Sequence, residues 1–375
     1  NEKICISSIE QLKIECEKSV TAGLMKSNPL TNFSPGSMTT ENYNTLDLHK
    51  NHVDEIILLS DLGEPMTREK DLIDVWFDSG SMPYAQWHYP FENKDLIDDQ
   101  KSYPADFIAE GVDQTRGWFY TLHAISSMVF DKVAYKNVIS NGLVLDKSGQ
   151  KMSKRLGNAV DPFETLSKYG PDATRWYMIT NAQPWDNLKF DLEGIKEVQR
   201  KFFGTLYNTY GFFSLYANVD GYKGTEKTMP LESRPEIDRW IISKLNSLIK
   251  EVELFYENYE PTKAGRAIQQ FVIDELSNWY VRLCRRRFWK GEFSEDKIAA
   301  YQTLHECLVS VSILSSPIAP FYSDELYRNL TCFMSNKQES VHLTLFPKIK
   351  EAAIDNDLEQ KMIIAQRVCS LVLGL

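Results

Sequence analysis

The sequence predicts a protein with an α/β region followed by an all-α region. Within residues 74–145, short β-rich runs alternate with a helix-compatible stretch, which is the layout of a βαβ unit with parallel strands. Beyond Asn187, apolar residues instead recur every three or four positions, as on one face of a helix. The 375 residues are enough for two or three domains of about 150 residues each.

The first 65 residues predict a connecting segment at the periphery. Residues 3–6 and 55–59 have β-like composition, and a stretch rich in Ser, Thr, Asn, Pro and Gly lies between them. Two histidines, His49 and His52, stand three positions apart. We expect these to be surface residues and not zinc ligands, because no further Cys or His stands at zinc spacing.

The α/β region is expected to span residues 66–195. Apolar runs at residues 107–109 and 137–140 predict two strands, and residues 114–130 predict the helix that joins them. Further along, Asp161 followed by a proline predicts a helix start, because Asp caps a helix N-terminus and Pro is tolerated in the first turn.

Residues 196–375 predict a helical bundle. One apolar helix face is indicated by residues spaced four, three, four and three apart, namely Ile241, Leu245, Leu248, Val252 and Phe255. Residues 263–288 and 298–314 continue this pattern. Residues 221–235 contain two prolines, and we expect them to link the α/β part to the all-α part.

The composition favours a folded protein of the reduced cytoplasm. The six cysteines stand far apart without a C-x-x-C pair, and no apolar stretch is long enough to cross a membrane. The net charge of −10 excludes a general attraction for nucleic acid, so any RNA binding must use local patches. The chain opens on Asn1 instead of Met and stops inside an apolar run, so we expect a fragment.

A basic stretch places three cations within five residues: Lys151-Met152-Ser153-Lys154-Arg155. Gly149 and Gly157 flank it and give the loop freedom to move. Such a run is ordinarily a solvated surface. However, an ammonium 4 Å from a phosphate oxygen gains about 4 kcal/mol at an effective dielectric near 20, so two lysines on one loop can stabilise a leaving pyrophosphate.

A second candidate stands where the first strand of the βαβ unit is expected to end: Glu110-Gly111-Val112-Asp113-Gln114. Ligands bind at the carboxyl ends of parallel strands, where carboxylates can reach ribose hydroxyls and an ammonium group. The alternative is that Glu110 and Asp113 only cap the helix that follows.

These two stretches carry a family resemblance. Residues 151–155 resemble the K-M-S-K-S loop of class I aminoacyl-tRNA synthetases, with Arg155 in place of the last serine. Residues 110–118 resemble the E-G-x-D-Q-x-R-G-W motif of isoleucyl-tRNA synthetases, and the resemblance extends over residues 45–330. It implies the second half of a Rossmann-like parallel sheet, followed by an anticodon-binding helical bundle.

The resemblance also implies residue roles. ATP binding is implied for Lys151, Ser153 and Lys154, of which the two lysines are the implied catalytic residues. Adenylate binding is implied for Glu110, Gly111, Asp113 and Gln114. Residues 74–80 are similar to a further stretch of the family, so Trp76 and Trp118 are candidate walls of an isoleucine pocket, with ordinary core tryptophans as the alternative.

Two positions indicate a branch of the family. Asn141-Gly142 stands where many bacterial members have His-Gly, and Arg155 replaces a serine. Together these residues resemble the eukaryotic-like branch of isoleucyl enzymes.

The helical half contains a dense basic stretch without an acid between Arg282 and Lys290. It resembles the anticodon-binding bundle of isoleucyl, valyl and leucyl synthetases, which implies tRNA binding by Arg282, Arg285, Arg286, Arg287 and Trp289. Three adjacent arginines cannot all face one way, so we expect one to pair with an acid such as Asp274 or Glu275. Alternatively, Trp279, Tyr280 and Trp289 belong to the core.

The resemblance implies ATP-dependent activation of isoleucine and its transfer to tRNA(Ile), with Mg²⁺ accompanying the ATP as substrate and no zinc in this chain. The partners implied are tRNA(Ile), isoleucine and ATP, without a membrane, in a monomer. We expect the fragment alone to be inactive, and the editing pocket to lie outside it. A valyl- or leucyl-tRNA synthetase fragment and a non-catalytic tRNA-binding paralogue remain as alternatives.

Overall fold

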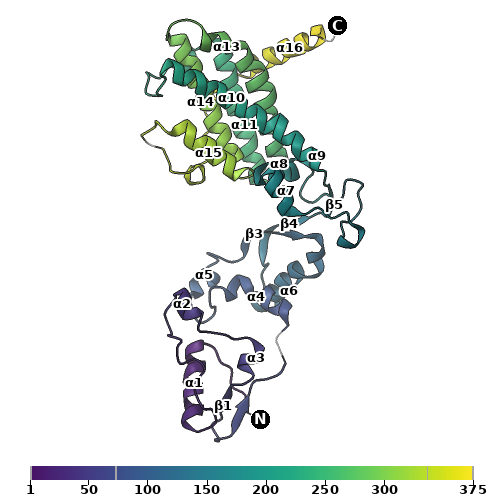
Figure 1. The fold of residues 1–375 in the computed structure, drawn as a ribbon, viewed down its shortest axis with the longest axis vertical. Helices are drawn as coiled ribbons and strands as arrows, with labels where there is room; N and C mark the ends of the chain where they lie inside the picture. Colours follow the sequence, from purple (N-terminus) through teal and green to yellow (C-terminus); the bar gives the residue numbers. More distant parts are fainter. Residues whose placement is uncertain (1, 72–73, 336, 374–375) are drawn as a thin grey trace. The chain divides into compact units, whose positions relative to one another are not determined.

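The computed structural model describes residues 2–71, 74–335 and 337–373 (Figure 1). The chain divides after Met82 into two compact units. Among the described residues, no helix has both the length and the apolar character that crossing a membrane requires. All six cysteines are free thiols.

The first unit is built around one helix and a small hairpin. Helix α1 (Ile9–Thr21) packs against β1 (Ile57–Leu59), which pairs antiparallel with β2 (Pro65–Thr67). The short helices α2 (Thr40–Tyr43) and α3 (Lys50–Val53) lie in the connection between them. The predicted strand at residues 55–59 is therefore confirmed.

The expected strand at residues 3–6 is wrong, because residues 2–8 form neither a strand nor a helix. Helix α1 begins immediately afterwards and was not predicted. Its start is fixed by a reciprocal cap, in which Ser8 Oγ accepts from the Gln11 amide at 3.1 Å and Gln11 Oε1 accepts from the Ser7 amide at 2.8 Å. A Ser followed three residues later by Gln is the sequence sign of such a cap.

The second unit contains the predicted βαβ layout. Strands β3 (Ala105–Gly111) and β4 (Tyr135–Asn141) pair in parallel, and α6 (Trp118–Phe130) joins them. A one-turn helix, η1 (Val112–Arg116), precedes α6, so the helix expected over residues 114–130 begins slightly later. Helices α4 (Val75–Ala85) and α5 (Lys94–Asp98) precede β3 in the chain.

A second small parallel sheet follows, formed by β5 (Val144–Leu145) and β6 (Leu188–Lys189). Between these strands run η2 (Lys154–Leu156), α7 (Pro162–Tyr169) and α8 (Pro171–Asn181). The predicted start of α7 is confirmed, because Asp161 Oδ1 accepts from the Phe163 and Glu164 amides. A small apolar cluster holds this region together, made of Tyr169, Ala173, Tyr177, Leu188, Phe190 and Ile195.

The rest of the chain is the predicted helical bundle, which confirms the expected change from α/β to all-α (Figure 1). Its longer elements are α9 (Leu192–Val198), η3 (Gln199–Phe203), α10 (Gly204–Asp220), α11 (Glu236–Glu257), α12 (Pro261–Gln270), η5 (Phe271–Val281), α13 (Arg282–Trp289), α14 (Glu295–Ser315), α15 (Pro320–Thr331) and α16 (Asn356–Leu373). Three single turns accompany them, η4 (Leu231–Ser233), η6 (Val341–Leu343) and η7 (Glu351–Ala353).

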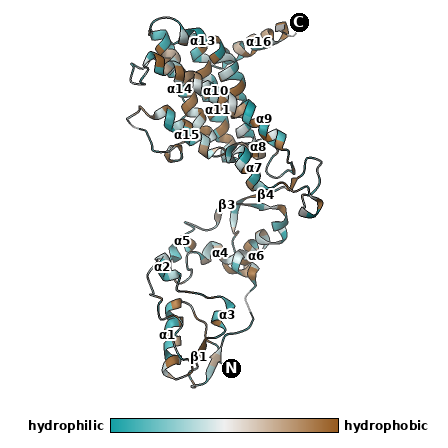
Figure 2. Ribbon diagram, in the orientation of Figure 1, coloured by the Kyte–Doolittle hydropathy of each residue, from teal (hydrophilic) through white to brown (hydrophobic). Residues whose placement is uncertain are grey.

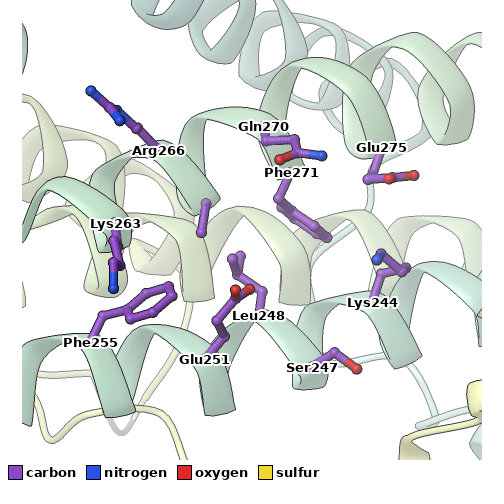
Figure 3. A pocket seen from close by; sticks show the side chains of 11 residues that line it. Lys244, Ser247, Leu248, Glu251, Phe255, Lys263, Arg266, Gln270, Phe271 and Glu275 are labelled. Atoms are coloured by element: carbon purple, nitrogen blue, oxygen red, sulfur yellow. The ribbon is translucent and has the colours of Figure 1, made fainter. Parts of the chain in front are cut away.

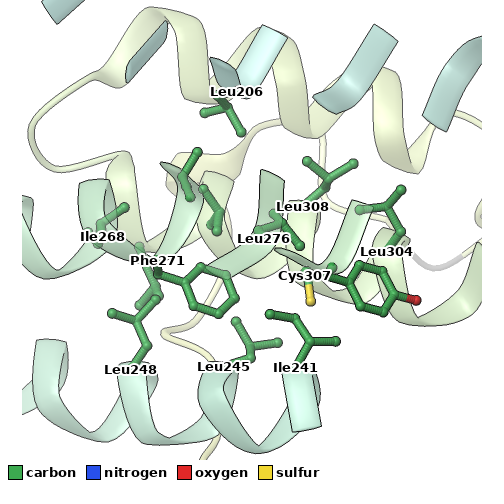
Figure 4. Packing of buried hydrophobic residues seen from close by; sticks show 14 of the residues in the cluster. Leu206, Ile241, Leu245, Leu248, Ile268, Phe271, Leu276, Leu304, Cys307 and Leu308 are labelled. Atoms are coloured by element: carbon green, nitrogen blue, oxygen red, sulfur yellow. The ribbon is translucent and has the colours of Figure 1, made fainter. Parts of the chain in front are cut away.

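One large apolar cluster fills the bundle. The predicted face of α11 is confirmed, because Ile241, Leu245, Leu248 and Val252 are buried and Phe255 packs against them. Figure 4 shows Leu245 and Leu248 beside Phe271, with Leu304 and Leu308 on the neighbouring helix. Coloured by hydropathy, the ribbon shows apolar residues spread along these packed helices (Figure 2).

The expected linker at residues 221–235 is wrong. This segment joins α10 to α11, and both helices contribute to the same apolar cluster. It also packs on the bundle, since Tyr222 stacks on Tyr301 at 4.9 Å and Arg234 Nη1 donates to Thr303 Oγ1 at 2.9 Å. Proline and glycine correctly indicated a loop, but they do not distinguish a loop within a domain from one between domains.

Candidate functional site

Two strand ends form the candidate site of the second unit. In the parallel ladder, Glu110 is opposite Ser140 and Gly111 is opposite Asn141. Because parallel strands end at the same edge of a sheet, the carboxylate of Glu110 and the amide of Asn141 lie at one edge. The Glu110 side chain is exposed there.

The chain turns sharply after β3 and brings Asp113 back over the strand end. A Cβ atom on Gly111 would stand only 2.6 Å from Asp113 Oδ1, so a side chain at this position would displace the Asp113 carboxylate. Gln114 then holds the turn in place, because its Nε2 donates to Asp113 Oδ2 at 3.1 Å and its Oε1 accepts from the Trp118 amide at 2.9 Å. Four predicted residues, 110, 111, 113 and 114, thus form one corner, which we call the acid–glycine corner.

The capping alternative is met only in part at this corner. Within the described ranges, η1 begins after Gly111 and α6 begins after Gly117, and neither has a side-chain cap at that residue. The amide of the first α6 residue is taken by Gln114 instead. Asp113 nevertheless lies in the first turn of η1, while Glu110 ends the strand β3 just before Gly111.

After β4 the backbone makes close contacts with the segment that follows α8. A Cβ atom on Gly142 would collide with the backbone of Asp186, so glycine is required for this approach. Two bonds fix it, from the Gly142 amide to the Pro184 carbonyl at 2.9 Å and from the Leu143 amide to Asn187 Oδ1 at 2.8 Å. This contact holds the exit of β4 against the segment between α8 and β6.

The basic loop, residues 146–158, begins at the end of β5. Asp146 Oδ1 accepts from the Ser148 amide at 2.9 Å and the Gln150 amide at 2.8 Å, which closes a tight turn. These bonds and the Asn158 amide lower the pKa of Asp146 below its usual range, so it stays ionised. Gly149 in this turn has φ +82°, a backbone conformation that suits glycine.

Residues 151–153 of the basic loop differ in exposure and in contacts. The Lys151 side chain is exposed, and the neighbouring Met152 packs against the small apolar cluster. Ser153 Oγ accepts from the Arg155 amide at 3.2 Å and so begins the turn η2. The side chain of Lys154 lies outside the described residues.

Strand pairing limits the distance between the acid–glycine corner and the basic loop. Gly111 is paired with Asn141, and Leu145 forms an antiparallel bridge with Lys151. From Asn141 to Leu145 the chain can extend about 14 Å at most, and each pairing adds about 5 Å. The Cα atoms of Gly111 and Lys151 therefore lie within about 25 Å of each other.

The two candidate pocket tryptophans belong to different compact units, Trp76 to the first and Trp118 to the second. Trp76 lies on α4 and is 46 % exposed, which excludes an ordinary core position. Trp118 begins α6 and is partly buried, with its ring 6.4 Å from that of Phe119.

The arginine-rich stretch of the bundle divides into two parts. Arg282, Arg285 and Arg286 are exposed on α13, and Trp289 at its end is 48 % exposed. Trp279 is only partly buried, and Tyr280 belongs to the core.

Arg287 is engaged in a buried ion pair and is not available for a partner, which corrects the sequence-based expectation. Its Nη1 and Nη2 donate to Asp238 Oδ1 and Oδ2 at 2.6 and 2.8 Å, and Asp296 accepts from its Nε at 3.0 Å. Tyr280 Oη also donates to Asp238 at 2.8 Å. One arginine thus pairs with acids as expected, but with Asp238 and Asp296 in place of Asp274 or Glu275.

Neither the histidine pair of the first unit nor the cavity of the bundle has the character of a specific site. His49 and His52 both contact Asp47, at 2.7 and 3.0 Å, on the surface, and the described part of the chain holds no group of three metal-ligating side chains. A cavity of about 320 Å³ lies between α11 and the α12–η5 helix (Figure 3). It is lined by both signs of charge, from Lys244, Glu251, Lys263, Arg266 and Glu275, which favours no single ligand.

Comparison with known proteins agrees with this geometry. Residues 25–191 match the family described as tRNA synthetases class I (I, L, M and V), and residues 238–373 match the anticodon-binding domain of tRNA ligase. The first match contains the acid–glycine corner and the basic loop, and the second contains most of the helical bundle.

Individual relatives agree with the family matches. The chain is 65 % identical to an isoleucine–tRNA ligase of Bacteroides thetaiotaomicron, 62 % identical to one of Porphyromonas gingivalis and 44 % identical to one of Clostridium acetobutylicum. These alignments cover 98–100 % of this chain but only 32–33 % of each relative, so the chain spans about a third of their length.

The fold is also similar to a solved structure. A LeuRS of Agrobacterium radiobacter K84, crystallised with tRNA and LeuAMS, superposes with a TM-score of 0.62 at 20 % identity, over 81 % of this chain and 36 % of that one. This likeness concerns the fold alone.

The chain belongs to the class I tRNA synthetases, and it carries part of their catalytic region followed by an anticodon-binding domain. Within that class, it corresponds to about a third of an isoleucine–tRNA ligase. The expectation of a partial sequence of such a ligase is thereby confirmed.

Sequence reasoning missed two residues that shape the site. Asn158 bonds to the basic loop from its far end, and Asn187 holds the exit of β4. The pair Gly157-Asn158 at the end of the basic loop is a recognisable turn signal in the sequence. For Asn187 the sequence offers no signal, because its partner Leu143 lies 44 residues away.

Proposed function

We propose that this chain supplies part of the active site with which a full-length isoleucine–tRNA ligase activates isoleucine with ATP and transfers it to tRNA(Ile). The observation that carries the proposal is the backbone connection between the acid–glycine corner and the basic loop. Its two pairings, Gly111 with Asn141 and Leu145 with Lys151, limit the distance between the Cα atoms of Gly111 and Lys151 to about 25 Å, which supports binding of one nucleotide by both elements.

In this proposal, the acid–glycine corner binds the adenylate. The exposed carboxylates of Glu110 and Asp113 accept hydrogen bonds from ribose hydroxyls or from the ammonium group of isoleucine. Gly111 leaves room for the ligand to approach the backbone, and Gln114 keeps Asp113 in position.

The basic loop binds the phosphates. The ammonium groups of Lys151 and Lys154, with Ser153 beside them, neutralise charge on the pyrophosphate as it leaves, and Mg²⁺ accompanies ATP as part of the substrate. Positioning and charge neutralisation carry the reaction, and no covalent enzyme intermediate forms.

Further assignments are part of the same proposal. Trp118 forms a wall of the isoleucine pocket, where a flat ring buries a branched side chain at little entropic cost. For Trp76, in the first unit, the same role rests on the family resemblance alone. Asn141 and Arg155 support membership of the eukaryotic-like branch of isoleucyl enzymes. The complete ligase works as a monomer in the cytoplasm, and the present residues alone are inactive because they lack the rest of the catalytic region.

For tRNA, the proposal uses the exposed cations of α13. Arg282, Arg285 and Arg286 bind phosphates, and Trp289 is free for stacking on a base. Arg287 is left out because Asp238 and Asp296 already occupy its guanidinium.

The experiment is isoleucine-dependent exchange of pyrophosphate into ATP by the full-length protein. Lys151→Ala or Lys154→Ala is expected to slow exchange by about 10²–10³-fold with little change in the KM for isoleucine, because the charge matters most as pyrophosphate departs. Glu110→Gln is expected to reduce the rate comparably. Trp118→Ala is expected to raise the KM for isoleucine and leave the KM for ATP unchanged.

Matched controls separate these roles from general loss of charge. Lys147→Ala removes an exposed cation of the same loop, and Asp106→Asn removes an exposed carboxylate at the opposite end of β3. Both controls are expected to retain nearly full exchange. Equal losses in the controls would contradict the assigned roles. Exchange that depends on valine or leucine would point to another ligase, and no exchange at all would point to a non-catalytic paralogue.

A further inference from the structure

We propose that Asp146 and Asn158 form a clasp that positions the basic loop, so that Lys151 is held ready for the phosphates. The proposal rests on the proposed function, because it assigns positioning residues for the same loop. It is drawn from the hydrogen bonds that these two side chains make with each other and with the loop backbone.

Asp146 holds the first half of the loop. Its Oδ1 accepts from the amides of Ser148 and Gln150, and the Asp146 amide donates to the Gln150 carbonyl at 2.8 Å. Its second oxygen, Oδ2, accepts from Asn158 Nδ2 at 2.9 Å. Both carboxylate oxygens are therefore used within the loop.

Asn158 holds the second half. Its Oδ1 accepts from the Ser153 amide at 2.9 Å, and its Nδ2 donates both to Asp146 and to the Lys151 carbonyl at 3.3 Å. The Asn158 side chain thus grips the backbone on both sides of Met152. Met152 itself packs against the small apolar cluster, so this part of the loop is held from two directions.

This arrangement matters for catalysis because Lys151 is one of the residues gripped. An electrostatic group contributes most to a transition state when it is already in position and does not need to reorganise. A displacement of about 1 Å can cost on the order of 10²-fold in rate. Neither Asp146 nor Asn158 needs to touch a substrate for this effect, so both are positioning residues.

The test is an exchange of the two side chains in the full-length protein. In Asp146→Asn, the side-chain NH₂ groups of residues 146 and 158 face each other, so two donors meet. In Asn158→Asp, the side-chain carboxylates of the two residues face each other, so two acceptors meet. In the double variant D146N/N158D, the side-chain NH₂ group of residue 146 donates to the carboxylate of residue 158. The backbone N–H groups of Ser148, Gln150 and Ser153 keep their acceptors. Only the bond to the Lys151 carbonyl is lost.

Each single variant is expected to lower kcat for pyrophosphate exchange by about 10–100-fold, with the KM for isoleucine within about twofold of the parent. The double variant is expected to recover to within about fivefold of the parent rate. Asp186→Asn, which removes an exposed carboxylate that makes no hydrogen bond within the described ranges, is the matched control and is expected to behave like the parent. Hydrogen exchange of the Ser148, Gln150 and Ser153 amides should accelerate in the singles and slow again in the double.

The outcomes distinguish this proposal from the proposed function. If the single variants keep full exchange while Lys151→Ala loses it, the clasp is wrong and the role of the loop stands. If the double variant shows the product of the two single losses, the two side chains do not act as a pair and the clasp is also wrong. If Lys151→Ala itself has no effect, the proposed function fails first.

Discussion

The helical bundle and the strand-end site differ in what holds them in place. In the bundle, side chains such as Leu276 and Leu308 are completely buried in one apolar cluster. In the strand-end site, Glu110, Asp113 and Lys151 are exposed, and hydrogen bonds and close backbone contacts fix the elements that carry them.

The difference follows from the chemistry that each region is proposed to perform. Burying a carboxylate or an ammonium without a partner is costly, so groups that must bind a nucleotide stay at the surface. Their positions then depend on glycines that allow close approach and on side chains that bond to the backbone. The bundle, by contrast, presents its exposed arginines on helices that pack around one buried apolar cluster.

The largest effect on stability is expected at a charged group that the bundle buries, the carboxylate of Asp238. Asp238→Ala leaves the guanidinium of Arg287 without its main partner and is expected to destabilise the bundle by about 3–5 kcal/mol. Arg286 is an exposed neighbour of Arg287 on α13, and Arg286→Ala is expected to change stability by less than about 0.5 kcal/mol. Urea unfolding of the two variants measures both values. Similar losses in both would show that the buried pair is not special.

A smaller loss is expected from a glycine beside the strand-end site. Gly142→Ala forces a Cβ against the backbone of Asp186 and is expected to cost about 1–3 kcal/mol and to slow pyrophosphate exchange. Exchange and unfolding are measured on the same full-length variant. A variant with parent-like stability and rate would mean that this close contact does not hold the exit of β4.

A glycine-to-alanine substitution in the bundle is expected to raise stability instead of lowering it. Gly211 lies inside α10, and a Cβ atom there would meet nothing within 4 Å. Gly211→Ala is therefore expected to stabilise the bundle by about 0.5–1 kcal/mol, since alanine favours a helix interior over glycine. A higher urea midpoint for Gly211→Ala and a lower one for Gly142→Ala would sharpen the contrast between the regions. A loss of stability for Gly211→Ala would contradict it.

The smallest expected effect is a pH dependence in the bundle. Burial lowers the pKa of His305, although the Leu330 carbonyl and the charge of Glu306 act in the other direction. The unfolded chain then binds the proton more readily than the folded chain, so stability is present above about pH 6.5 and is lost as the pH falls below it. His305→Gln is expected to reduce this loss between pH about 7.5 and about 5.5. His123→Gln, at an exposed histidine, should leave the slope unchanged.

Periodic patterns made the bundle largely predictable. The stripe from Ile241 to Val252 places one face of α11 in the core without knowledge of its partners. The ion pair of Arg287 with Asp238 was not predictable, because 49 residues separate the two and only the packing of α11 against the helix containing α13 brings them together. Burial of an arginine depends on tertiary structure, so the sequence of a basic stretch does not show which arginine is buried.

The strand-end site was predictable in its motifs but not in its supports. The order of strand, corner and loop follows from the local sequence, whereas the bond between Asp146 and Asn158 depends on how the loop between them folds. The β-like composition of residues 3–6 predicted a strand that does not form, since a strand needs a partner and composition alone does not supply one.

The central claim is that the acid–glycine corner and the basic loop bind the same nucleotide. A crystal structure of the full-length protein with isoleucinol, Mg²⁺ and a methylene-bridged ATP analogue tests it most directly. We expect one bound nucleotide, with the Glu110 carboxylate within hydrogen-bond distance of its sugar or of the amino alcohol, and the Lys151 ammonium on its phosphates. A nucleotide that contacts only one of the two elements, or that lies elsewhere, would contradict the claim.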